Sequence, residues 1–249
     1  MIKGVDGTGP YNTTLFNFEN RVSHVRTAVL GSKETQQEYL RGPGLDGLDM
    51  ELLANQVVAW VKIFRQKQPK DRIILVGHSR GGAAVIRAAQ IIQQQGPSAF
   101  APKGGAPHVV GRVLIDAMFL FDAVNMTPSC SLDRLPSNIV KCYHAMRSPS
   151  AGSRATWGNC GIDTSIPNQM VKQTFFGSHA AMGGTPLTGD LPAFTTKTKM
   201  LGQNDTDDPS EIGQVVHVEQ STHWKTIDPA CAKAVKSWMW THLKHHNVV

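Results

Sequence analysis

The stretch ILVGHSRGGAAVIRAAQII, residues 74–92, decides the fold class. It starts as a short apolar run typical of a buried strand, breaks at Gly77, and continues from Gly82 with apolar residues at helical spacing. Ser79 lies at the corner between the two parts and completes the pattern G-x-S-x-G. A strand before this pattern and a helix after it predict a tight turn that exposes the serine hydroxyl. Ser79 is therefore the candidate nucleophile.

The rest of the chain alternates strand-like and helical segments. We expect strands at residues 1–7, 37–43, 72–78, 112–123, 138–146, 170–178 and 214–220. A helix is predicted at residues 51–68, with these side chains near one face: Leu52, Leu53, Val57, Val58, Val61 and Phe64. A closing helix is predicted at 230–246. This order favours a mostly parallel sheet flanked by helices, and together with the serine turn it predicts a single α/β-hydrolase domain over residues 1–249.

Two segments fit neither the strand nor the helix pattern. Residues 147–169 and 183–211 are rich in Gly, Pro, Ser, Thr and Asp. Segments of this composition run over the surface of a domain and often carry parts of its site. We expect both to be loops or lids over one edge of the sheet.

Composition limits the classes of partner and compartment. The 249 residues carry a net charge of +6, but the Lys and Arg residues are scattered, so we expect no nucleic-acid partner and only peripheral contact with anionic lipid. No apolar run is long enough for a transmembrane segment, and residues 1–10 do not have the pattern of a cleavable signal peptide. We expect a soluble protein made in the cytoplasm, whose export would need a specialised secretion system. The four cysteines have no C-x-x-C pair and are interpreted as free thiols.

A serine nucleophile needs a base, and the base needs an acid that orients it. Asp122 ends the apolar segment 112–123, so its carboxylate is expected at the carboxyl edge of the sheet beside Ser79. Asp116 lies earlier in the same segment and is interpreted as a carboxylate within the strand. For the base, His179 follows the segment 170–176, whereas His223 follows the segment 214–220 and precedes the last helix. The order Ser, Asp, His fits both histidines, and the position after a late strand favours His223.

The turn after the first expected strand, VDGTG at residues 5–9, supplies candidates for an oxyanion hole. The backbone N–H of Gly7 or Thr8 is expected to join that of Arg80, the residue after the serine. The Asp6 side chain is equally well explained as a turn-forming residue.

We expect neither a metal nor an organic cofactor. The acidic segment 205–211 does not have the spacing of a calcium loop, and the histidines at 242, 245 and 246 are interpreted as the frayed basic end of a helix. No phosphate-binding loop or dinucleotide fingerprint is present in the sequence.

Five short motifs occur in a family-like order: VDGTG (5–9), GHSRGG (77–82), FDAV (121–124), YHAM (143–146) and GSHAAMGG (177–184). In these motifs the chain resembles the bacterial α/β-hydrolases that include phospholipase effectors delivered by type VI secretion. Their pattern runs F-D-G-T, G-F-S-R-G-A, F-D-T-V, a strand ending in H-A, and G-V-H-S-D-V-G-G. This chain has His78 where that pattern has Phe.

The resemblance implies Ser79 as nucleophile, Asp122 as acid and His179 as base, and it moves the preference from His223 to His179. It also implies hydrolysis of a carboxylic ester through an acyl-enzyme, with lipid-like acyl chains. An acyltransferase or peptidase with the same triad, and a non-catalytic binding module on this fold, are the alternatives.

Overall fold

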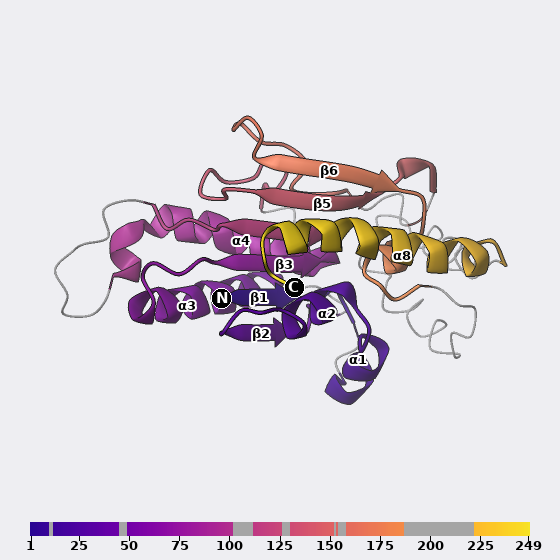
Figure 1. Cartoon of the computed structure of the whole chain (residues 1–249), viewed down its shortest axis with the longest axis horizontal. Helices are drawn as coiled ribbons and strands as arrows, with labels where there is room; N and C mark the ends of the chain where they lie inside the picture. Colours follow the sequence, from indigo (N-terminus) through magenta and orange to yellow (C-terminus); the bar gives the residue numbers. More distant parts are fainter. Residues whose placement is uncertain are drawn as a thin grey trace.

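The computed structural model describes residues 1–9, 12–44, 49–101, 112–125, 130–151, 153, 158–186 and 222–249. Within them, one parallel sheet has the strand order β2-β1-β3-β4-β5-β6 (Figure 1). Its strands are β1 (Ile2–Val5), β2 (Gln37–Leu40), β3 (Ile74–His78), β4 (Ala117–Phe121), β5 (Cys142–Arg147) and β6 (Met170–Phe175). Because all neighbouring strands are parallel, their carboxyl ends meet at one edge of the sheet.

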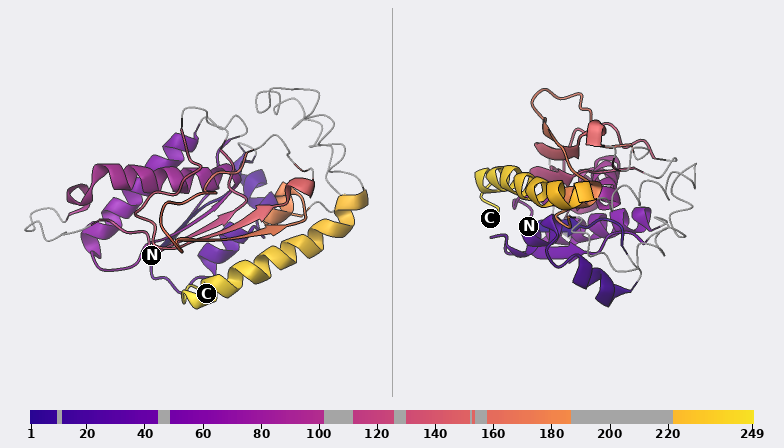
Figure 2. Two further views of the ribbon diagram at one scale, coloured as in Figure 1. Left: turned by 90° about the horizontal axis from the view of Figure 1, so that it is seen from above. Right: turned by 90° about the vertical axis from the view of Figure 1, so that its right-hand side faces the viewer.

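Helices cover both faces of this sheet. They are α1 (Thr13–Glu19), α2 (His24–Leu30), α3 (Met50–Lys67), α4 (Ser79–Gln95), α5 (His179–Met182) and α8 (Thr222–His245), with short 3-10 turns η1 (Pro97–Phe100) and η2 (Pro149–Ala151). Figure 2 shows α3 and α4 on one side of the sheet and α8 on the other. Two buried apolar clusters result, one under α3 and α4 and one under α2 and α8.

The central strand β3 explains why the quoted stretch is apolar without alternation. Leu75 packs into the cluster under α3 and α4, whereas Ile74 and Val76 pack into the cluster under α2 and α8. A strand that is buried on both faces reads as a continuous apolar run. The α/β class with a mostly parallel sheet, predicted from the sequence, is confirmed.

Several boundaries differ from the prediction. Of the expected strand 112–123, only Ala117–Phe121 forms a strand of the sheet, β4. Before it, Ile115 forms an isolated bridge with Ile139, and the Asp116 carboxylate accepts the N–H of Ile73 at 2.7 Å. Leu52 is exposed, whereas the other five apolar residues named for that helix are buried. The last helix begins at residue 222 and contains Pro229. The expected strand 214–220, and residues 187–211 of the second expected loop, lie outside the described residues.

Helices α1 and α2 were missed, although α2 carries a capping signal. The Ser23 hydroxyl accepts the N–H of Arg26 at 3.1 Å at its start. Within the described part of the chain, no helix has the length and apolar character that a membrane span requires. Cys142, Cys160 and Cys231 are buried thiols.

The end of α8 is packed, which corrects the expectation of a frayed terminus. The His242 ring stacks on Tyr143 with centroids 4.1 Å apart, and the Tyr143 hydroxyl lies 3.0 Å from His246 Nε2. These contacts hold the C-terminal turn of α8 against β5.

Buried histidines make the stability of the fold depend on pH, and His144 and His24 are two of them. His144 accepts the Ala123 N–H at Nε2 and faces the Gly161 carbonyl through Nδ1, so its hydrogen bonds require the neutral ring. Burial lowers the pKa of His144 and of His24 to about 4, against 6.5 for an exposed imidazole. The unfolded chain therefore binds more protons than the folded one between about pH 6.5 and pH 4.

We predict that the free energy of unfolding falls as the pH drops through this window, by up to about 1.4 kcal/mol per pH unit for each histidine whose pKa is lowered by burial. Urea unfolding at pH 7 and pH 5 measures it. His144→Gln keeps a donor and an acceptor but cannot titrate. In this variant, the fall in the free energy of unfolding between pH 7 and pH 5 should be smaller by the contribution of one histidine. An unchanged slope in this variant would contradict the assignment to His144.

Candidate active site

Ser79 lies on a strained turn directly after β3. Its φ is +55°, a left-handed value that is uncommon outside glycine. A Cβ on Gly77 would lie 2.6 Å from Gly82 Cα, so the turn is too tight for any larger residue there. The first residue of α4 therefore holds its hydroxyl in a fixed position at the carboxyl edge of the sheet, as the sequence predicted.

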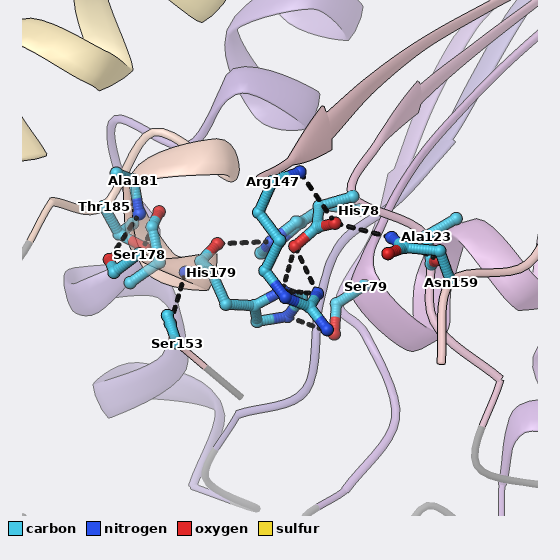
Figure 3. Close-up of polar contacts among 12 residues, drawn as sticks. His78, Ser79, Ala123, Arg147, Ser153, Asn159, Ser178, His179, Ala181 and Thr185 are labelled. Atoms are coloured by element: carbon cyan, nitrogen blue, oxygen red, sulfur yellow. Dashed lines mark hydrogen bonds and ion pairs between the residues drawn. The ribbon is translucent and has the colours of Figure 1, made fainter. Parts of the chain in front are cut away.

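The His179 imidazole joins side chains from two other segments, the Ser79 hydroxyl and the Asp122 carboxylate. Figure 3 shows the His179 ring beside Ser79. His179 Nε2 lies 2.8 Å from Ser79 Oγ, and His179 Nδ1 lies 2.6 Å from Asp122 Oδ2. Asp122 follows β4 with a φ of +46°, and His179 begins α5 shortly after β6. Ser79, Asp122 and His179 are buried, with exposed fractions of 2%, 0% and 8%. One imidazole thus joins a hydroxyl to a carboxylate, the geometry that proton transfer from a serine requires.

The Asp122 carboxylate accepts hydrogen bonds on both oxygens. Oδ1 accepts the Arg147 N–H at 3.2 Å and the Asn159 amide at 2.6 Å, and Oδ2 accepts Arg147 Nη1 at 2.6 Å beside His179. Burial alone would raise the pKa of Asp122, but its contacts with His179 and Arg147 hold it well below the usual range. The carboxylate is therefore ionised at neutral pH.

Arg147 and Asn159 were not found by the sequence reasoning. Arg147 ends β5, whose first four residues are buried, and is itself buried. A cation at the end of an expected strand was a usable signal, because a buried cation needs an anionic partner. Asn159 lies in an irregular segment and carries no comparable signal.

His179 is held in place from both sides of α5. Its N–H donates to Ser153 Oγ at 3.0 Å. The preceding Ser178 donates its N–H and its hydroxyl to Asp228 of α8, at 2.9 and 2.5 Å. Burial lowers the pKa of His179 to about 3, opposed by Asp122 and assisted by His78 and Arg147, so the ring is neutral at pH 7 and can accept a proton.

The other candidate residues lie elsewhere. The position between Ser79 and Asp122 is occupied by His179, whereas His223 falls in the first turn of α8, where its side chain lies outside the described part of the structure. The Asp116 carboxylate is engaged with Ile73 at the amino end of β3. Asp116 is therefore a structural carboxylate, as the sequence analysis interpreted it.

The turn after β1 lies against the serine, since a Cβ on Gly7 would be 3.1 Å from Ser79 Cβ. The Gly7 N–H donates to Asp6 Oδ1 at 2.8 Å and is thus engaged, so of these two candidates we carry Thr8 forward as the proposed oxyanion donor. Arg80 Nε donates to Thr8 Oγ1 at 2.7 Å, which ties the two remaining donor residues together. Asp6 itself is buried and also accepts Ser23 Oγ at 2.5 Å and Tyr39 OH at 2.8 Å.

Metal-ligating side chains do not gather in the described ranges: no group of three or more His, Cys, Asp or Glu residues there is arranged to hold an ion. The acidic segment 205–211 lies outside those ranges.

The structure combines three features: a parallel sheet, a serine on the strand-to-helix turn after a central strand, and a histidine after a later strand. The fold is that of the α/β-hydrolases. No protein-family model matches the chain, and a search of curated proteins gives no match.

Among solved structures, an uncharacterized protein from Pseudomonas aeruginosa is similar at 13% identity and a TM-score of 0.47. The alignment covers 97% of this chain and 51% of that one, so the chain spans about half the length of that protein. The NocB thioesterase domain, in covalent complex with a fluorophosphonate nocardicin G analog, is similar at 12% identity and a TM-score of 0.39 (82% and 93% covered). The RedJ thioesterase of prodiginine biosynthesis in Streptomyces coelicolor is similar at 13% identity and a TM-score of 0.34, and the alignment covers 82% of this chain and 86% of that one.

The buried pair of Arg147 and Asp122 yields a prediction about stability. Arg147→Met leaves the buried carboxylate short of a cation and should lower the free energy of unfolding by about 3–5 kcal/mol. The same change in an Asp122→Asn background should cost clearly less, because the charge that needs Arg147 is gone. A double-mutant cycle in urea measures the difference.

The exposed pair of Arg134 and Asp163, 3.0 Å apart, is the matched control. Its cycle with Arg134→Met and Asp163→Asn should show no measurable coupling, because solvent screens the charges. Equal coupling in the two cycles would show that burial of the Asp122 pair has no special effect.

Proposed function

We propose that the protein is a serine hydrolase that cleaves carboxylic esters through an acyl-enzyme. The observation that carries the proposal is the single imidazole of His179 within hydrogen-bonding distance of both Ser79 Oγ and Asp122 Oδ2. A neutral imidazole in this position is a base for the serine hydroxyl, and the ionised carboxylate stabilises the imidazolium that forms.

The reaction proceeds in two matched halves. His179 Nε2 takes the proton of Ser79 as Oγ attacks the ester carbonyl, and the tetrahedral oxyanion accepts N–H groups from Arg80 and Thr8. His179 then gives the proton to the departing alkoxide, which leaves an acyl group on Ser79. Water attacks the acyl-enzyme with His179 again as base, and the acid product leaves. The start of α4 at Ser79 adds the positive end of a helix dipole to the oxyanion site.

A lipid-like ester is the substrate class we propose. The motif resemblance to phospholipase effectors supports it, and so do two exposed apolar side chains on α1 and the turn after it, Phe18 and Val22, which are 64% and 58% exposed. The Arg21 guanidinium lies 4.4 Å from the centroid of the Phe18 ring, so an apolar and a cationic group lie together here, a combination that suits contact with anionic lipid. Phe16 of α1 packs near Gly9, at the end of the turn that lies against Ser79. Release through a specialised secretion system belongs to the same proposal.

The first test concerns the nucleophile. Ser79→Ala should fold normally while lowering ester turnover by about three to six orders of magnitude, because the covalent route is lost. Turnover is measured on p-nitrophenyl esters of graded chain length beside phospholipids, and a fluorophosphonate probe should label only the wild type. Labelling that persists at another serine would reject Ser79. Turnover of peptides or transfer to added alcohols in preference to water would favour a peptidase or an acyltransferase, and no turnover of any substrate would favour a binding module.

The second test concerns the acid and the base. Asp122→Asn should cost on the order of 10⁴ in rate, because it favours the wrong imidazole tautomer, whereas Asp116→Asn should retain most activity. His179→Ala should be as inactive as Ser79→Ala, with no further loss in the double variant, since the residues act as a unit. His223→Ala is the matched control and should keep substantial activity. If only His223→Ala is inactive, the base is His223 and the proposed reaction class still holds.

A further inference from the structure

A second pair of imidazole and carboxylate lies beside the candidate site. His78 immediately precedes Ser79, is 7% exposed, and its Nδ1 lies 3.5 Å from Asp6 Oδ1. Its Nε2 lies 3.4 Å from the main-chain carbonyl oxygen of His179. The two histidine rings stack, with centroids 5.0 Å apart and an interplanar angle of 29° (Figure 3). The His78 ring therefore contacts both the ring and the main chain of His179, the residue that would act as base.

Both ring nitrogens of His78 face oxygen acceptors. A neutral imidazole carries one N–H and can donate to only one of them, whereas the imidazolium donates to both. Asp6 is a fit counter-ion, because its buried carboxylate also accepts hydrogen bonds from the Gly7 N–H and from the hydroxyls of Ser23 and Tyr39, which favour the ionised form. The surroundings of His78 thus match its cationic form.

The His78 ring has little freedom to leave this position. A Cβ on Gly7 would lie 2.6 Å from His78 Nδ1, and a Cβ on Gly183 would overlap the other side of the ring. The ring is therefore enclosed between the turn after β1 and the end of α5. These are the segments that supply the proposed oxyanion donor and the proposed base, so His78 sets their separation.

We propose that His78, as an imidazolium held by Asp6, is a positioning residue that fixes the main chain of His179 and holds the His179 imidazole in its neutral, proton-accepting form. The inference rests on the proposed function. Its physical basis is the repulsion between two imidazolium rings at this distance, which disfavours a proton on His179 in the resting enzyme.

Other charged groups act on the same two rings. Asp122 and Arg147 face His179 from the ends of β4 and β5, and Asp6 faces His78 from the end of β1. On the α2 side lies His24, whose pKa burial and then the charge of His78 lower to about 4, so it is neutral at pH 7. Substituting His78 therefore removes its proposed charge from beside His179 and leaves the ion pair of Asp122 and Arg147 intact.

The test compares His78→Phe, which keeps an aromatic ring without N–H groups or charge, with His78→Gln, which keeps a donor without charge. In both, the acid limb of kcat/KM should move to higher pH by about one unit, because protonation of His179 is no longer opposed. At neutral pH, kcat should fall about tenfold in His78→Phe and less in His78→Gln, with KM little changed, because only Gln can still hold the His179 carbonyl. Acid limbs at the wild-type position in both variants would overturn the inference.

A measurement on the full chain covers the case in which these variants fail to fold. In ¹⁵N-histidine-labelled Ser79→Ala protein at pH 7, nuclear magnetic resonance should show both His78 ring nitrogens protonated and His179 neutral. A neutral His78 would overturn the inference whatever the enzyme's activity. If the wild type hydrolyses no ester, the proposed function fails, and this spectrum still reports separately on His78.

Discussion

The buried carboxylate of Asp122 is the constraint on which the site depends. A fully buried charge without partners would cost several kcal/mol, so each of its oxygens must receive hydrogen bonds. The donors come from the end of β5, from Asn159 and from the start of α5, segments that are 25 to 57 residues away along the chain. Satisfying one carboxylate therefore places Arg147 and His179 relative to the sheet edge, and the position of His179 relative to Ser79 follows.

The two strained residues of the site support each other. Ser79 and Asp122 both have left-handed φ values, and each directly follows one of two neighbouring strands, β3 and β4. The Val124 N–H donates to the Ser79 carbonyl at 3.2 Å, and a Cβ on Gly82 would lie 2.5 Å from that of Ala123. Strain of this kind persists only where the surrounding structure over-determines it. Here the parallel pairing of β3 with β4 supplies that surrounding structure for both turns.

What the sequence could predict follows from the range of each interaction. The turn at Ser79 and the alternation of strands and helices are local patterns, and they were read correctly. The length of the expected strand 112–123 was predicted wrongly. The residue before the start of β4, Asp116, accepts a hydrogen bond from Ile73, which is 43 residues away along the chain. Arg147, Asn159 and the partners of His78 depend on contacts between distant segments, which no periodicity encodes. The preference for His179 came from motif resemblance, since the position after a late strand by itself favours His223.

Charge is arranged around His179 in a way that bears on both halves of the proposed reaction. The neutral ring is flanked by two groups that disfavour its protonation, His78 at 5.0 Å between ring centroids and Arg147 Nη1 at 3.4 Å from Nδ1. Such a ring is a weaker base toward Ser79, but once protonated it is a stronger acid toward the leaving alkoxide. Asp122 opposes this effect and keeps proton abstraction feasible. In the proposed reaction, the balance between the Asp122 carboxylate and the two groups that oppose protonation of His179 favours proton transfer to the departing alkoxide.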